Sequence, residues 1–187
     1  MLDNVVRMMK SVRVPCFGSV QNGVNRLIWM LAVLMNFKLF CKSEKVLVVI
    51  VKRFFQIHNF ADTCNASPSL MLKFDNGVLR VDSLQGLNDF ASNPARGDHA
   101  NVLSSTVLAS SLMGQDVSLR VLFDTGRFGS VSVYLDGQRV VNNASMETPD
   151  CATPHIKLGI YRPHDPAGGT SRMWFRDTVV FPTSPPS

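Results

Sequence analysis

The sequence of 187 residues lacks most of the short motifs by which enzymes are identified. It has no phosphate-binding loop, dinucleotide-binding fingerprint, nucleophile elbow or internal repeat, which removes several enzyme classes. Its four cysteines are widely spaced, without a Cys-x-x-Cys pair or a Cys/His ligand spacing. The pattern therefore argues against a structural zinc site, and we expect no metal ligands.

The sequence also lacks an uninterrupted apolar run long enough for a confident membrane span. Residues 27–41 are its most apolar stretch, but Asn36 and Lys38 interrupt them, whereas a spanning helix needs about 20 apolar residues. An uncleaved signal-like segment is one alternative, although the run lies deeper than an ordinary signal peptide and no clear cleavage site follows it. Residues 46–51 are either one buried strand or more of the same apolar segment.

Basic charge is concentrated near the start of the chain. The formal net charge is +5, but residues 1–55 hold nine basic and two acidic residues, whereas the remainder holds ten basic and twelve acidic ones. The overall pI is therefore a poor guide to the later region. Because no nucleic-acid-binding motif accompanies the basic residues, we do not expect a nucleic-acid partner.

From Lys52 onward, short alternating runs separated by turn signals are typical of strands. Asp75-Asn76-Gly77 predicts a tight hairpin between residues 70–74 and 78–81, and Asp136-Gly137 predicts a second one. Residues 83–115 contain one possible strand, at 101–108. Strands at this spacing indicate an all-β sandwich or barrel.

Two polar side chains interrupt the apolar run Phe54-Phe55-Gln56-Ile57-His58. In a strand, successive side chains alternate between the two faces, so Gln56 and His58 would share one face while Phe55 and Ile57 pack on the other. This is the geometry of a paired polar site. A half-exposed strand whose polar face simply meets water fits the same pattern.

A second informative stretch covers residues 155–162, HIKLGIYR. Alternation places His155, Lys157, Gly159 and Tyr161 on one face, which combines a cation and a phenol with a gap above the glycine. The other face is apolar and points to a core. An outer strand face with an incidental lysine and tyrosine is the alternative.

Together, Gln56-Ile57-His58 and the later Lys157-Leu158-Gly159-Ile160-Tyr161 resemble the jelly-roll polysaccharide lyases. The pattern is most similar to the alginate lyases of polysaccharide lyase family 7, which carry a QIH or QVH motif and a late YFKAGVYNQ-like motif. Glucuronan lyases and heparin-lyase-like proteins are also similar. The resemblance covers roughly residues 53–181 and implies an all-β, concanavalin-like jelly-roll sandwich.

The resemblance implies cleavage of a uronic-acid-containing polysaccharide, of the alginate or glucuronan type, by β-elimination. Gln56 would help to hold the sugar carboxylate, His58 would be a base or neutralising group, and Tyr161 would be the acid and a candidate for the base. Lys157 and Arg162 would supply positive charge to the polyanion. This chemistry requires no metal or organic cofactor.

Some of the family pattern is missing from this chain. The family also uses an arginine in an RSELR-like strand upstream of QIH, and residues 1–52 contain no such segment; Arg53 is too close to QIH to serve instead. In the late motif, His155 replaces an aromatic residue and Arg162-Pro163 replaces an amide. The details of substrate recognition are therefore open.

The strands that normally precede QIH would have to come from a region that does not resemble them. We therefore expect a jelly roll that is incomplete at its N-terminus, with a divergent segment at 1–51, a lyase-like domain at 52–181 and a tail at 182–187. Such a lyase could be inactive. A non-catalytic carbohydrate-binding jelly roll and a surface protein tethered to a membrane through residues 27–51 are the alternatives.

The expected partner is an acidic polysaccharide, and we expect a secreted or extracellular monomer. A disulfide between Cys64 and Cys151 would fit export. The sequons Asn65-Ala66-Ser67 and Asn143-Ala144-Ser145 point weakly in the same direction.

Overall fold

The computed structural model describes residues 10–13, 30–41, 52–61, 64–89, 91, 96–151, 153–161 and 171–183, whose regular secondary structure is almost all β-strand and forms two antiparallel sheets. The first sheet has the order β1-β11-β3-β5-β6-β7, with the short β4 also paired to β3. Its strands are β1 (Lys10–Arg13), β3 (Lys52–Ala61), β4 (Cys64–Asn65), β5 (Leu70–Asp75), β6 (Val78–Gln85), β7 (Asp98–Asn101) and β11 (Thr153–Tyr161).

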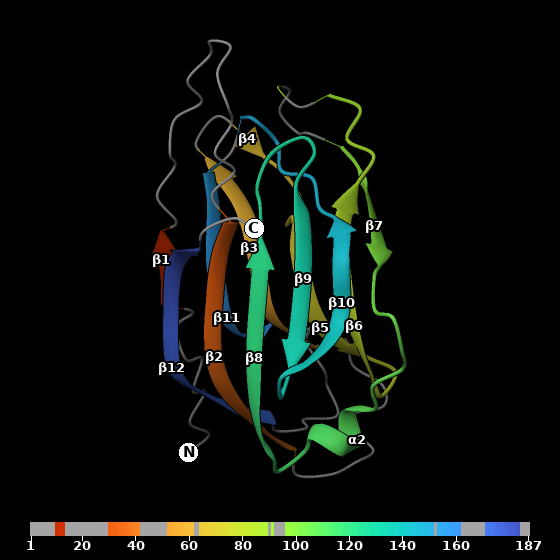
Figure 1. Cartoon of the computed structure of the whole chain (residues 1–187), viewed down its shortest axis with the longest axis vertical. Helices are drawn as coiled ribbons and strands as arrows, with labels where there is room; N and C mark the ends of the chain where they lie inside the picture. The colour runs from red at the N-terminus through yellow and green to blue at the C-terminus, as the bar shows by residue number, and fades with distance from the viewer. Residues whose placement is uncertain are drawn as a thin grey trace, which may run out of the picture.

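The second sheet has the order β10-β9-β8-β2-β12 and lies in front of the first in Figure 1. Its strands are β2 (Met30–Cys41), β8 (Asp116–Phe123), β9 (Ser130–Leu135), β10 (Gln138–Ser145) and β12 (Ser171–Thr183), and a single helical turn, α2 (Ala109–Leu112), precedes β8. The described chain is thus a two-layer, all-β sandwich, as the alternating sequence predicts.

The core fills the space between the inner faces of the two sheets. Buried apolar residues of β2, β3, β5, β6, β8, β9, β10 and β11 lie there, and the largest fully buried side chains include Phe37, Phe54, Phe55, Phe74 and Phe123. Aromatic contacts join the layers, because Phe37 of the second sheet lies 5.2 Å from Phe54 of the first, centroid to centroid. Burial of this apolar surface is the main stabilising term for such a fold.

Both predicted hairpins are confirmed. Asn76 and Gly77 join β5 to β6 with φ values of 49° and 76°, and Asp136 and Gly137 join β9 to β10 with values of 48° and 80°. Two consecutive residues at positive φ make the tight turn whose twist matches that of paired strands, and Asn, Asp and Gly adopt this region most easily.

The apolar stretch at residues 27–41 contains a strand that the sequence pattern did not predict. Residues 30–41 form β2, which is paired on both sides, with β8 and with β12. Its inward residues Val33, Met35, Phe37 and Leu39 are buried, so β2 is a structural strand of the sandwich. Among the described residues, no helix is both long enough and apolar enough to cross a membrane.

The prediction of a strand at residues 101–108 is wrong for most of its length. The strand in this region, β7, ends at Asn101, and the following residues run beside β6 as a loop. Two backbone contacts hold the loop there, from Val102 N–H to Val81 and from Leu79 N–H to Val107.

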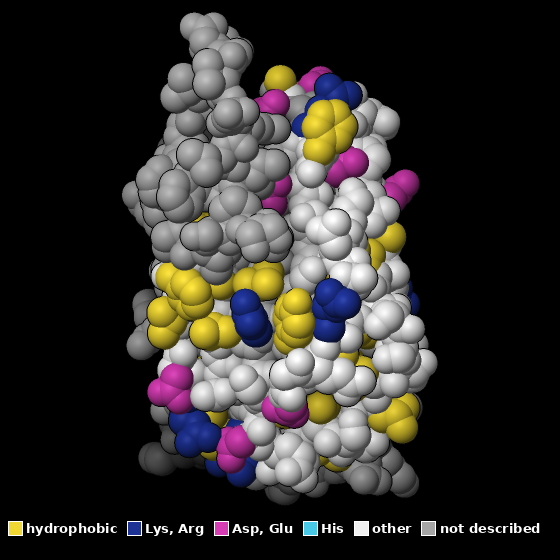
Figure 2. All heavy atoms as spheres, in the orientation of Figure 1, with side chains coloured by type: hydrophobic (Ala, Val, Ile, Leu, Met, Phe, Trp, Pro, Cys, Tyr) yellow, Lys and Arg dark blue, Asp and Glu magenta, His cyan; other side chains and the backbone are white. Residues whose placement is uncertain are grey.

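The outer face of the second sheet carries a band of hydrophobic and basic side chains across its middle, as Figure 2 shows. Cross-strand register places Val179, Leu34, Arg120, Tyr134 and Arg139 in one row. The Arg120 guanidinium lies 5.4 Å from the centroid of the Tyr134 ring. This row provides positions for control substitutions on the face opposite the candidate site.

Candidate functional site

The pairing of β3 with β11 brings the two polar motifs together on one sheet. Gln56 lies directly opposite Lys157, and His58 lies directly opposite His155. Directly opposite residues of antiparallel strands share a face, with Cβ atoms about 5 Å apart. The intervening residues of both strands, such as Ile57, point into the core. The predicted face-sharing of Gln56 with His58, and of His155 with Lys157, is therefore confirmed.

A bulge brings Arg53 to this same outer face. Between Arg53 and Phe55, β3 has one more residue than β5. Two successive residues, Phe54 and Phe55, therefore both pack in the core. Arg53 is opposite Lys73, on the side of β5 that lies away from the core. Bulges often re-aim a side chain in this way. Strict alternation along the sequence does not predict this position for Arg53.

A second bulge places Tyr161 beside Arg53. The β11 strand has an extra residue between Leu158 and Tyr161 relative to β3, and Tyr161 pairs with Arg53. Gly159 lies in this bulge with φ of 151°, a backbone conformation that side-chain-bearing residues rarely adopt. The Arg53 guanidinium lies 5.3 Å from the centroid of the Tyr161 ring, and Tyr161 is 53% exposed. The phenol is therefore open to a ligand.

The outer face thus holds two groups of polar residues rather than one. Tyr161 and Arg53 form the first, whereas Gln56, His58 and Lys157 lie farther along the strands. At about 3.3 Å per residue, His58 lies up to about 16 Å from Arg53 along β3, and Gln56 about 10 Å. Tyr161 and His58 therefore share a face without lying side by side.

His58 is poised to remain neutral at physiological pH. Burial lowers the pKa of His58 below its usual 6.5, and the charge of Lys157 lowers it further. The backbone of Asn59 acts in the opposite direction, and the charge of His155 has the smallest effect and lowers the pKa. The Nδ1 atom of His58 is buried and makes no hydrogen bond of acceptable geometry within the described chain. Burial also lowers the pKa of Lys157. A neutral imidazole can accept a proton or a hydrogen bond from a ligand.

This lowered pKa predicts a loss of stability in mild acid. The unfolded state takes up the His58 proton first, near pH 6.5, so the free energy of unfolding should fall as the pH drops from about 7.5 to 5.5. His58→Gln should flatten this part of the pH dependence. Urea unfolding midpoints of both proteins across this range test the prediction, and equal slopes would contradict it.

The N-terminal region does contribute a strand beside the site. The register of β1 with β11 places Arg13 opposite His155 and Ser11 opposite Lys157. Although residues 1–52 contain no RSELR-like segment, β1 carries an arginine, Arg13, at the edge of the sheet. Its four residues, Lys10–Arg13, are too few for a sequence pattern to distinguish from a loop.

Two other predictions are only partly addressed. Arg162 lies outside the described residues, so its role stays a prediction. Cys151 is disulfide-bonded, and its pairing with Cys64 stays a prediction as well. Among the described residues, no three histidine, cysteine, aspartate or glutamate side chains form a group that could hold a metal ion.

Comparison with known proteins supports the fold. No family model matches the sequence, and no curated protein matches it. Among solved structures, a family 7 alginate lyase is similar, with a TM-score of 0.52 and 16% identity over 83% of this chain and 60% of that one. Another is a substrate-bound family 7 alginate lyase in which a histidine is replaced by asparagine and a tyrosine by phenylalanine, with a TM-score of 0.56, 13% identity, and coverage of 85% of this chain and 63% of that one.

The endo-β-1,4-glucuronan lyase from the fungus Trichoderma reesei is similar to the same degree, with a TM-score of 0.52 and 15% identity over 81% of this chain and 67% of that one. The chain therefore has the jelly-roll fold of these polysaccharide lyases, as predicted. It spans 60% and 63% of the length of the two alginate lyases.

Proposed function

We propose that the outer face of the first sheet binds a uronic-acid-containing polysaccharide of the alginate or glucuronan type, and that the protein cleaves it by β-elimination. One observation carries the proposal. On a lyase-like fold, the β3–β11 pairing gathers Gln56, His58, Lys157 and Tyr161 on one sheet face. The substrate-bound alginate lyase to which the chain is similar had a histidine and a tyrosine replaced, and this face presents both residue types.

The reaction needs three groups. A base removes the proton from the carbon beside the sugar carboxylate, and the electron pair forms a carbon–carbon double bond as the neighbouring carbon–oxygen bond breaks. An acid then gives a proton to the departing glycosidic oxygen. Donors must stabilise the negative charge that develops on the carboxylate. The products are a shortened chain and a chain with an unsaturated sugar at its end.

Tyr161 and Arg53 lie in contact on the outer face, and we assign them to the sugar whose glycosidic bond breaks. Tyr161 would deliver the proton to the leaving oxygen and, as a phenolate, would accept the proton from carbon. Arg53 lies against its ring and would hold the carboxylate of the same sugar, because a guanidinium matches a carboxylate with two parallel hydrogen bonds. The Nε atom of Arg53 is buried without a hydrogen-bond partner among the described residues, which leaves a donor unused.

Gln56, His58 and Lys157 would hold the neighbouring sugars of the bound chain. Their distance from Tyr161 along the strands suits contacts to adjacent rings rather than proton transfer at the same bond. Because polysaccharides of this kind lie outside cells, we also propose that the protein is secreted, which the disulfide at Cys151 supports.

A non-catalytic carbohydrate-binding jelly roll is the second candidate. One observation favours it, which is the separation of Tyr161 from His58 in the β3–β11 register. Such a protein would use the same face and residues for binding and would release no product.

One experiment separates the two candidates. Purified protein, shown to be folded by circular dichroism, is incubated with alginate, glucuronan and heparin. The ultraviolet absorbance of the unsaturated product is followed, and binding is measured by electrophoresis through polymer-containing gels. Product formation supports the lyase, and retardation without product supports the binding module. Folded protein that neither cleaves nor binds these polymers contradicts both.

Arg53→Gln should weaken polymer binding about tenfold or more, since a hydrogen bond to a charged group contributes about 1.5–3 kcal/mol. Affinity electrophoresis or titration calorimetry with the polymer identified above measures the change. Arg172→Gln, an equal change of charge at an exposed residue of the second sheet, serves as control. Equal weakening in both variants would show that only net charge matters.

A further inference from the structure

A row of residues crosses the first sheet from the candidate catalytic tyrosine to the β5–β6 hairpin. Tyr161 is opposite Arg53, Arg53 is opposite Lys73, and Lys73 is opposite Arg80. Four successive strands, β11, β3, β5 and β6, therefore each place one member of the row on the outer face. With neighbouring strands about 4.8 Å apart, Arg80 lies about 14 Å from Tyr161 across the sheet.

Two cations of this row, Lys73 and Arg80, differ in how fully neighbouring carboxylates pair with them. Lys73 is held by Asp82 at 2.6 Å, and both side chains are largely buried, so this pair is structural. The Arg80 side chain is 40% exposed and shares its longer contacts, of 3.3 Å and 3.9 Å, between Asp82 and Asp75. A guanidinium has five N–H donors, so Arg80 retains donors for a ligand.

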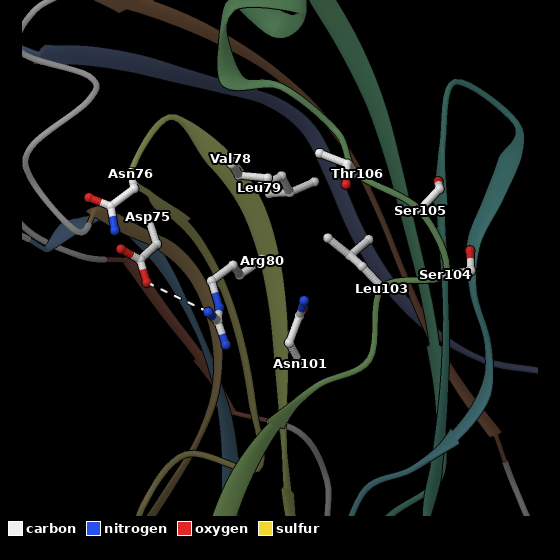
Figure 3. Close-up of a pocket in the computed structure, with 10 residues that line it drawn as sticks. All are labelled: Asp75, Asn76, Val78, Leu79, Arg80, Asn101, Leu103, Ser104, Ser105 and Thr106. Atoms are coloured by element: carbon white, nitrogen blue, oxygen red, sulfur yellow. Dashed lines mark ion pairs between the residues drawn. The ribbon is translucent and has the colours of Figure 1, made fainter.

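Arg80 also lines a pocket of about 440 Å³ at this end of the row. Figure 3 shows Arg80 and its partner Asp75 on one side of the pocket and the loop of residues 103–106 on the other. The lining combines one cation, one carboxylate, two amides and hydroxyl groups with aliphatic surface. These groups come from Arg80, Asp75, Asn76, Asn101, Ser104, Ser105, Thr106, Val78, Leu79 and Leu103.

This chemistry suits a sugar ring that carries a carboxylate. The cation can bind the sugar carboxylate, the amides and hydroxyls can exchange hydrogen bonds with ring hydroxyls, and the aliphatic side chains can pack against the ring carbons. Two of the polar groups are already engaged within the protein: Asn101 accepts a hydrogen bond from Val81 N–H, and Ser104 donates one to the Val140 carbonyl. Their positions are therefore set before a ligand arrives.

We propose that the Arg80 pocket is a distal subsite that binds an acidic sugar of a chain whose reacting bond lies at Tyr161. The inference rests on the proposed function and extends it, because it places an acidic sugar across the strands from Tyr161, on a different side from the sugars held along the strands by Gln56, His58 and Lys157. A substrate must span three strand spacings to occupy both places. The pocket therefore selects long acidic polysaccharides over short ones.

Arg80→Gln should raise the KM, or the Kd where no product forms, about tenfold for the polymer and leave the value for the corresponding trisaccharide unchanged. The kcat should not change, because the pocket is remote from the reacting bond. Asp82 keeps its contact with Lys73 in this variant, so the fold is expected to persist. Arg139→Gln, on the outer face of the second sheet, is the matched control.

A second variant tests the pocket without removing a charge. Thr106→Trp, at an exposed lining residue, should obstruct the pocket and reproduce the same length-dependent loss. Unchanged polymer KM or Kd in both variants, or equal losses for polymer and trisaccharide, would overturn the subsite while leaving the proposed function intact. Wild-type protein that neither binds nor cleaves the polymers would instead overturn the proposed function itself.

Discussion

Tyr161→Phe is expected to reduce the rate of polysaccharide cleavage by about 10²- to 10⁴-fold, the usual contribution of a positioned acid or base. The change removes one hydroxyl from a ring that is 53% exposed, so neither the core nor the sheet pairing is disturbed. The ring would keep its contact with Arg53, whose guanidinium lies over it. Binding of the polymer should therefore persist while product formation is lost.

The measurement is the rate of the rise in ultraviolet absorbance at several polymer concentrations, which separates kcat from KM. Tyr134→Phe is the matched control, since Tyr134 also lies beneath an arginine, Arg120, but on the second sheet. It should leave both parameters unchanged. Full activity in Tyr161→Phe would show that another group moves the proton, with His58 the first to test.

The register between β3 and β11 predicts different effects for the replacement of Tyr161 and of His58. If Tyr161 and His58 acted on one sugar, each variant alone would stop the reaction. Their separation along the strands instead predicts that replacing His58 mainly weakens binding. A drop in kcat with an unchanged KM in His58→Gln would therefore favour a rearranged register in the bound state.

Period-two alternation predicts much of this site from sequence. It correctly places Gln56 and His58 on one face of β3, and His155 and Lys157 on one face of β11, because those residues lie in regular parts of the two strands. The place of Arg53 is not predictable in this way. An extra residue in a bulge reverses which face the following residue occupies, and nothing in the local sequence marks the bulge beside Phe54.

The β2 strand was missed for a different reason. Asn36 and Lys38 look like interruptions of an apolar segment, but in the sheet they lie on the outer face of β2, between the buried Met35, Phe37 and Leu39. They are the polar half of an alternating strand. The apolar residues before them hid the period, because Ala32 is buried along with Val33.

Phe37→Ala should lower the free energy of unfolding by about 3–5 kcal/mol, the usual cost of truncating a buried phenylalanine. Phe37 is 1% exposed and packs on Phe54, which stacks on Phe74 with centroids 5.1 Å apart. The three rings join β2 to β3 and β5. The substitution therefore measures how firmly residues 30–41 belong to the sandwich that carries the site.

Equilibrium unfolding in urea or guanidinium gives the value, with Phe128→Ala as control. Phe128 is 82% exposed, so its truncation should change stability by no more than about 0.5 kcal/mol. If Phe37→Ala cost as little, residues 30–41 would not pack in the core, and the same apolar segment would again be available as a membrane tether. A large cost instead makes β2 indispensable, because the second sheet would otherwise lose the strand that joins β8 to β12.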